Sequence, residues 1–239
     1  MRFWLLILLF IGTTSNASEI GEISEFRGTG EVLRNEDGDK LLAELALDIF
    51  SYDDVRTGDG RIAIEFLDSS VLKLTEHSKV VIDNYIYDPD PSKSKLALNM
   101  ASGTARFITG ALGRINKENI SIQTPSATIA IRGTDFTTTV DELGRSLVIL
   151  LPDASGKSSG EITVTTWSGT EVLNQPFQAT MVSTFEAEPT KAVVLGNLTL
   201  GLIDNMLIVN KPPEVQEAME EQQGESKTEL DKDFFEDAP

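Results

Sequence analysis

The chain offers few side chains that could serve as a nucleophile, a base or a metal ligand. It has no cysteine and one histidine, His77, which excludes disulfides, thiol catalysis and thiolate or histidine-rich metal sites. Glu76 and Ser78 flank His77, but neighbouring strand residues point to opposite faces. A glycosidase mechanism with two paired carboxylates stays an open alternative, because the distance between such carboxylates depends on the tertiary structure. We expect no enzyme activity and no catalytic residue, and interpret His77 as an exposed residue at a strand end.

Several aspartates form the second group with chemical potential. They precede or lie within predicted turns: Asp53, Asp54, Asp59, Asp68, Asp88 and Asp90. Calcium takes six to eight oxygen ligands, which clustered loop aspartates could supply. No stretch matches the calcium-binding D-x-[DN]-x-[DN]-G loop with its distal glutamate. We therefore interpret them as turn and cap residues and expect no metal and no cofactor, with a calcium-stabilised module as an alternative.

The net charge excludes a nucleic-acid partner. Lys and Arg number 20 against 38 Asp and Glu, which gives a formal charge of −18. Binding to phosphates requires clustered Lys and Arg instead. The same acidity weighs mildly against anionic polysaccharides as ligands.

Residues 1–17 are typical of a cleaved secretory signal peptide. Arg2 precedes an unbroken run of nine apolar residues, Phe3 to Ile11, and small residues follow at Ser15 and Ala17. This run is shorter than the roughly 20 apolar residues that a membrane span needs. We expect cleavage after Ala17 and export to a bacterial periplasm or exterior. With no cysteine, the exported chain is not a lipoprotein, and cleavage leaves no transmembrane anchor.

Short segments of alternating hydrophobicity run from Ile20 to about Val182. In residues 61–66, Ile62, Ile64 and Phe66 share one face of a predicted strand. The other alternating segments are residues 71–74, 95–100, 120–122, 129–131 and 162–164. Turn formers separate them at residues 59–60, 68–70, 88–91, 101–103 and 168–169. We predict an all-β fold, a single antiparallel two-layer sandwich or roll of many short strands.

The pattern changes after about Glu188. Leu195, Leu198, Leu202 and Met206 have helical spacing, while two glycines weaken a helix there. We expect residues 141–210 to continue the β domain, with either a short helix near residues 195–208 or a last strand pair. Residues 211–239 hold ten acidic residues against three lysines and few apolar ones, so we expect a disordered acidic tail.

Five segments, taken in order, resemble the FecR-domain family of bacterial exported proteins. They read D-D-V-R-T-G at 53–58, F-L-D-S-S at 66–70, G-T-A-R-F-I-T-G at 103–110, T-P-S-A at 124–127 and I-R-G-T-D-F at 131–136. A strand pair near residues 20–32 extends the resemblance, which covers residues 20–140 well. We therefore place a FecR-like β domain at residues 18–140. Ser69 departs from the family, which prefers glycine there.

The resemblance implies structural roles for its motif residues. They are Gly58, Asp59, Asp68, Gly103, Phe107, Thr124, Pro125, Arg132, Gly133, Thr134 and Phe136. Thr124-Pro125 is expected to end a strand, because proline cannot donate to a sheet. We expect Arg132 to pin the bend at Gly133 by binding backbone carbonyls or a carboxylate such as Asp135 or Asp68; an anion-binding role for Arg132 is the alternative.

The resemblance also implies a function. In regulators of iron-transport signalling, the family's domain lies in the periplasm and is joined by one membrane helix to a cytoplasmic segment that controls a sigma factor. This chain shows neither that segment nor a second long apolar run, so we expect it not to transmit such a signal alone. We predict a protein–protein interaction or sensing module in the bacterial envelope with an envelope protein as partner. The alternative is a structural or adhesive protein that binds polysaccharide or cell wall.

Overall fold

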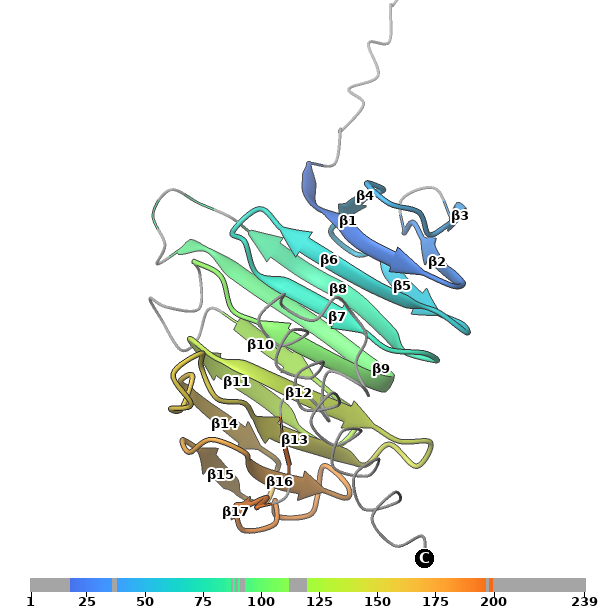
Figure 1. Cartoon of the computed structure of the whole chain (residues 1–239). Coiled ribbons are helices and arrows are strands. Elements are labelled where there is room, and N and C mark those ends of the chain that lie inside the picture. Colours follow the sequence, from blue (N-terminus) through green and yellow to red (C-terminus); the bar gives the residue numbers. More distant parts are fainter. Residues whose placement is uncertain are drawn as a thin grey trace, which may run out of the picture.

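The computed structural model describes residues 18–35, 38–86, 88, 90, 93–111, 120–196, 198 and 199. The described chain forms strands and turns with no α-helix, and nearly all strand pairs are antiparallel (Figure 1). The predicted all-β class is confirmed. The predicted leader at residues 1–17, the acidic tail and nearly all of the expected helix near 195–208 fall outside the described residues.

Two layers of strands share one long strand, β9 (Lys95–Ile108). In the first layer the order is β4 (Asp48–Phe50), β1 (Glu19–Arg27), β6 (Arg61–Phe66), β7 (Val71–Leu74), β9, β12 (Asp135–Val140), β13 (Ser146–Leu150), β16 (Gln178–Val182) and β17 (Val193–Val194). In the second layer it is β3 (Lys40–Leu42), β2 (Gly30–Leu33), β5 (Asp54–Thr57), β8 (Lys79–Ile86), β9, β10 (Ile120–Gln123), β11 (Thr128–Arg132), β14 (Glu161–Thr165) and β15 (Thr170–Leu173).

One apolar core lies between the layers. Ile62, Ile64 and Phe66 of β6 are buried as the alternation predicted, and they belong to the same cluster as Ile82 and Leu98 of the second layer. The cluster continues into β13, β14, β15 and β16. Alternating Ile, Val and Leu therefore hold the two layers together by burying one face of each, which supplies the main stabilising free energy.

Strand β9 passes from one layer to the other, contrary to the turn expected at residues 101–103. Its first half pairs with β8 and with β10, the one parallel pairing among the described strands, and its second half pairs with β7 and β12. Gly103 lies at the junction with a φ of +91°. A glycine adopts this conformation without steric cost, so the strand bends and its hydrogen bonding continues.

No helix in the described part of the chain is long and apolar enough to span a membrane.

Candidate functional site

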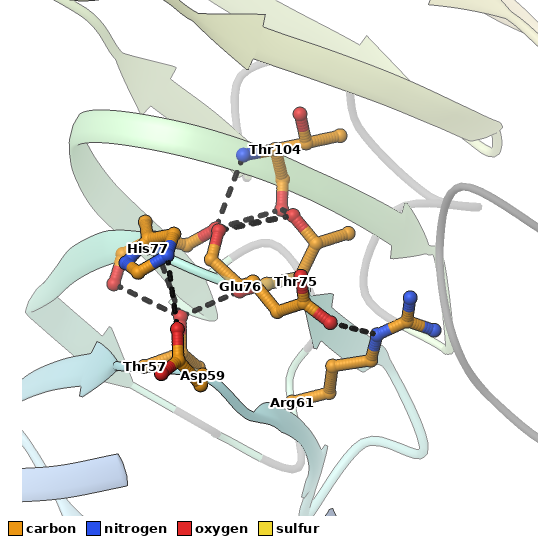
Figure 2. A network of polar contacts seen from close by, with 8 residues as sticks. Thr57, Asp59, Arg61, Thr75, Glu76, His77 and Thr104 are labelled. Atoms are coloured by element: carbon orange, nitrogen blue, oxygen red, sulfur yellow. Dashed lines mark hydrogen bonds and ion pairs between the residues drawn. The ribbon is translucent and has the colours of Figure 1, made fainter. Parts of the chain in front are cut away.

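The motif residues of β5 and β9 meet around Ser78, which is buried in the turn between β7 and β8. Figure 2 shows Thr57, Thr75 and Thr104 of this cluster. The Ser78 N–H donates to Thr57 Oγ1 (2.8 Å), and the Thr57 N–H donates to the Ser78 carbonyl (3.0 Å). Ser78 Oγ donates to the Thr104 carbonyl and accepts from the Thr104 N–H, both at 3.1 Å. A Cβ at Gly103 would collide with the backbone and side chain of Ser78. The cluster thus joins β5, β8 and the bend of β9.

Two polar side-chain pairs lie at the exposed rim of this cluster (Figure 2). His77 Nε2 is 3.2 Å from Asp59 Oδ1, and both side chains are largely exposed, at 74% and 90%. Arg61 Nε lies 3.3 Å from Glu76 Oε1. His77 is therefore exposed at the entry to β8, as expected. Its partner is Asp59, and the Ser78 hydroxyl is bound to Thr104 instead, so His77 and Ser78 do not form a nucleophile–base pair.

Asp68 organises the turn between β6 and β7. Its side chain accepts hydrogen bonds from the Ser70 N–H (3.1 Å) and the Ser70 hydroxyl (2.7 Å), and Ser70 Oγ accepts one from the N–H of Gly110 (2.8 Å). The Tyr85 hydroxyl accepts from the Asp68 N–H (3.1 Å). Ser69, where the family prefers glycine, has a φ of +61°. Serine therefore adopts the left-handed conformation at this turn.

The segment from Arg132 to Phe136 connects β11 with β12. Gly133 has a φ of +59°. The Thr109 hydroxyl accepts a hydrogen bond from the Thr134 N–H (3.0 Å) and donates one to the Thr134 carbonyl (2.6 Å). Phe136 is fully buried and lies opposite Phe107 of β9, with ring centroids 6.1 Å apart. The motif thus bends the chain between layers and places an aromatic pair in the core.

The expected partner of Arg132 is wrong. The Asp135 carboxylate binds Arg106, with Nε and Nη2 at 2.8 and 2.6 Å from its two oxygens, and this bidentate pair joins β9 and β12. The Arg132 side chain is exposed, opposite Glu161 in register. It makes no hydrogen bond or ion pair with the described residues. Its position at the end of β11 directs it to the outer face, since Ile129 and Ile131 alternate with it and occupy the core.

Thr124 and Pro125 follow the end of β10, as expected. The Thr124 hydroxyl bonds the carbonyl and N–H of Ala127 (3.1 and 3.0 Å) and accepts a hydrogen bond from the Ser146 hydroxyl (2.8 Å). Ser146 accepts in turn from Ser126 (2.7 Å). This buried chain of hydroxyls fixes the turn between β10 and β11 against the start of β13.

Gly58 and Asp59 form the turn after β5. A Cβ at Gly58 would lie 2.6 Å from Thr29 Oγ1, while the Gly58 N–H donates to the Thr29 carbonyl (3.0 Å). This close approach explains the glycine at position 58, whereas the side chain of Asp59 serves only the exposed pair with His77.

Residues 156–160 have the Gly-x-Ser-x-Gly spacing of a serine-hydrolase nucleophile turn. The expectation of no catalytic residue did not take this spacing into account. In the structure they lie in the loop between β13 and β14, with no helix after the serine. Ser158 Oγ donates to the Gly160 carbonyl (2.8 Å). Ser159 Oγ donates to the Leu151 carbonyl (2.7 Å) and accepts from the Asp135 N–H (2.9 Å). Both hydroxyls therefore stabilise the loop.

In the described residues no group of three or more His, Asp or Glu side chains is arranged to hold a metal ion.

The sequence did not indicate that Asp53 would be buried against Arg34. Asp53 Oδ2 accepts from the Phe50 N–H (2.9 Å) and from Arg34 Nη1 (3.1 Å), and the guanidinium lies 4.3 Å from the ring centroid of Phe50. Burial raises the pKa of Asp53 above its ordinary value, although the Phe50 N–H and Arg34 oppose this shift. The shift makes the site sensitive to pH.

We expect Asp53→Asn to change how stability depends on pH. The folded chain binds the Asp53 proton more tightly than the unfolded chain does, so this carboxyl reduces the free energy of unfolding as pH rises through its raised pKa. The stability of the variant relative to the wild type should therefore improve as pH rises above about 4. Urea unfolding at a series of pH values measures this difference. A constant difference, or one of opposite slope, would contradict the shift.

Comparisons with known proteins identify the class. Residues 53–170 match the model of the family described as FecR protein. The chain thus contains a FecR domain, and the resemblance predicted from the motifs is confirmed. The match begins and ends later than the expected residues 20–140, and it includes β13 and β14.

Two crystal structures of a candidate anti-sigma factor from Parabacteroides distasonis are similar to the chain. One is 14% identical, with a TM-score of 0.49 over 68% of this chain and 70% of that chain. The other is 15% identical, with a TM-score of 0.46 over 62% and 64%. The comparison with curated proteins found no significant match.

Proposed function

We propose that the chain is an exported, non-catalytic FecR-domain protein that acts as a protein–protein interaction or sensing module in the bacterial envelope. The FecR match over residues 53–170 carries this proposal, because the family is one of regulatory proteins. The leader pattern of residues 1–17 supports export. N-terminal sequencing of the exported protein should begin at Ser18.

The hydrogen bonding of the motif residues supports a binding role over catalysis. The hydroxyls of Ser70, Thr109 and Thr124 each form hydrogen bonds with backbone groups of neighbouring strands or turns. The single histidine is exposed and paired with Asp59. These hydroxyls therefore stabilise the contacts between strands. A catalytic nucleophile would need a base within hydrogen-bond distance.

Arg132 is a motif residue with an exposed side chain that makes no hydrogen bond or ion pair with the described residues. It is exposed at the end of β11, and its guanidinium can bind a carboxylate with two parallel hydrogen bonds. We therefore include Arg132 in the partner-binding surface, with an acidic side chain or a carboxyl terminus of the partner as its ligand.

Arg132→Ala is expected to leave the free energy of unfolding within about 0.5 kcal/mol of the wild type and to reduce partner capture about ten-fold or more. Arg145→Ala is the matched control: this arginine is also exposed, but it lies outside the motif segments and is paired with Asp141. Affinity capture from solubilised envelopes, quantified by mass spectrometry, compares the two variants. Equal capture by both would remove Arg132 from the binding surface.

The same capture experiment tests the proposed function as a whole. We expect one envelope protein to be enriched specifically with the wild-type chain. Capture of peptidoglycan or polysaccharide without a protein would contradict the proposal and favour an adhesive role. Capture of no specific protein would also contradict it.

A further inference from the structure

Strand β13 is apolar on both faces. Val148 and Leu150 point into the core, while Leu147, Ile149 and the next residue, Leu151, alternate with them and point outward. A sheet with one face in water normally alternates apolar and polar residues, and a continuous apolar run indicates a strand that is covered on both sides. We therefore expect the outer face of β13 to be buried by another segment.

The apolar outer surface continues onto β16 and ends at β12. Leu147 lies opposite Met181 of β16, and Ile149 lies opposite Ala179. On the other side, the partners of Leu147 and Ile149 are Thr139 and Thr137 of β12. We define the outer patch as the residues Leu147, Ile149, Leu151, Ala179 and Met181. Its position on the outside of the first layer distinguishes it from the core between the layers.

The last described residues of the chain cover one half of the outer patch. The Leu195 N–H donates to the Phe177 carbonyl (3.0 Å), and Leu195 and Leu198 pack with Phe177 against Ile149, Leu151 and Ala179. These contacts leave Ile149 only 9% exposed and bury Leu151 completely. Leu147 and Met181 form the other half, and each is 37% exposed.

The residues that follow have the composition needed to cover the other half. Residues 199–209, T-L-G-L-I-D-N-M-L-I-V, contain seven large apolar side chains and one charge, Asp204. Leu147 is two positions from Ile149 on the same strand, a distance of about 7 Å. Eleven residues span about 16 Å even in a helix, so the segment reaches Leu147 and Met181 from its starting point on the patch.

We propose that residues 199–209 dock on the outer patch of the same chain and bury Leu147 and Met181. The segment starts on the patch, so its effective concentration there exceeds that of a free partner. The docked segment would occupy the outer patch in place of another protein. The surface that binds the envelope partner then lies away from the outer patch.

Hydrogen exchange of the full chain, followed by mass spectrometry, tests the docking. Peptides covering residues 199–209 should exchange slowly in the wild type and about ten-fold or more faster in Leu147→Asp and Met181→Asp, because a buried charge opposes docking. Val172→Asp is the matched control: Val172 is similarly exposed (39%) on β15 of the second layer and should leave these peptides unchanged. Exchange of the wild-type segment at the rate of an unstructured peptide would overturn the proposal, as would protection unchanged by both patch variants.

The absence of cysteine allows a second test that does not disturb the patch with charge. A short bismaleimide should link Met181→Cys to Met206→Cys within one chain, whereas Val172→Cys with Met206→Cys should give no such product. Thermal unfolding confirms that each variant is folded. Links formed only between two chains, with protection that rises with protein concentration, would overturn docking within one chain and identify a second copy as the occupant.

Discussion

Replacing Gly103 by alanine is expected to lower the free energy of unfolding by about 2–5 kcal/mol. Two effects add: a side chain at the left-handed φ of +91° is strained, and its Cβ would collide with the backbone of Ser78. The bend carries β9 from one layer to the other, so relaxing it disturbs pairing with both β7 and β8. Urea unfolding followed by circular dichroism measures the loss.

Gly156→Ala separates these two effects. Gly156 has a similar φ of +78°, but its Cβ would meet no atom within 4 Å. This variant should lose only the cost of the left-handed conformation, about 1–2 kcal/mol. A Gly103→Ala chain no less stable than Gly156→Ala would show that the packing of Gly103 against Ser78 does not matter.

Truncating Phe136 to alanine is expected to lower the free energy of unfolding by about 3–5 kcal/mol. Its ring is fully buried and packs against Phe107 where β12 pairs with β9. Removing it leaves a cavity at the point where the arginine-glycine-threonine motif turns the chain into the first layer, and the neighbouring strands cannot fill that space without moving. Thermal and urea unfolding both report the change.

Trp167→Ala is the control for Phe136→Ala. Trp167 is a larger aromatic residue but is 85% exposed in the turn between β14 and β15. Its removal should change the free energy of unfolding by no more than about 0.5 kcal/mol. Similar losses in the two variants would contradict the position of Phe136 in the core.

The sequence was sufficient to predict the all-β class, because strands with one buried face leave a two-residue period, as in Ile62, Ile64 and Phe66. The shared strand β9 could not be predicted in the same way. Residues 101–103 have turn chemistry, and only the pairing of β9 with β8 before the bend and with β7 and β12 after it shows that hydrogen bonding continues. The parallel pairing of β9 with β10 is also a tertiary property that leaves no local pattern.

Prediction of the site succeeded where a residue's role is local and failed where it depends on distant partners. Thr124 ends its strand, and Gly133 bends the chain, as their types indicate. Asp135 binds Arg106, which is 29 positions away in sequence. Its closeness in sequence to Arg132 wrongly suggested Arg132 as the partner. The same limit applies to Arg34 and Asp53, which meet only after β2 and β5 pair.

The exposed position of Arg132 changes how the family motif is understood. Gly133 and Phe136 are explained by a bend and a core aromatic pair, and the backbone of Thr134 is bonded to the Thr109 hydroxyl. Arg132 beside them is exposed, and our proposal assigns it to the partner-binding surface. Under this proposal, the motif positions one exposed residue for binding while its other members hold the sheet that carries it.

Photo-crosslinking in intact cells tests most directly whether this chain binds a protein in the envelope. A photoreactive amino acid is placed at position 132, with position 145 as the exposed control outside the motif segments. We predict a discrete crosslinked product with one envelope protein from position 132 and not from position 145. No protein crosslink from position 132, in cells that export the chain normally, would contradict the proposed interaction module.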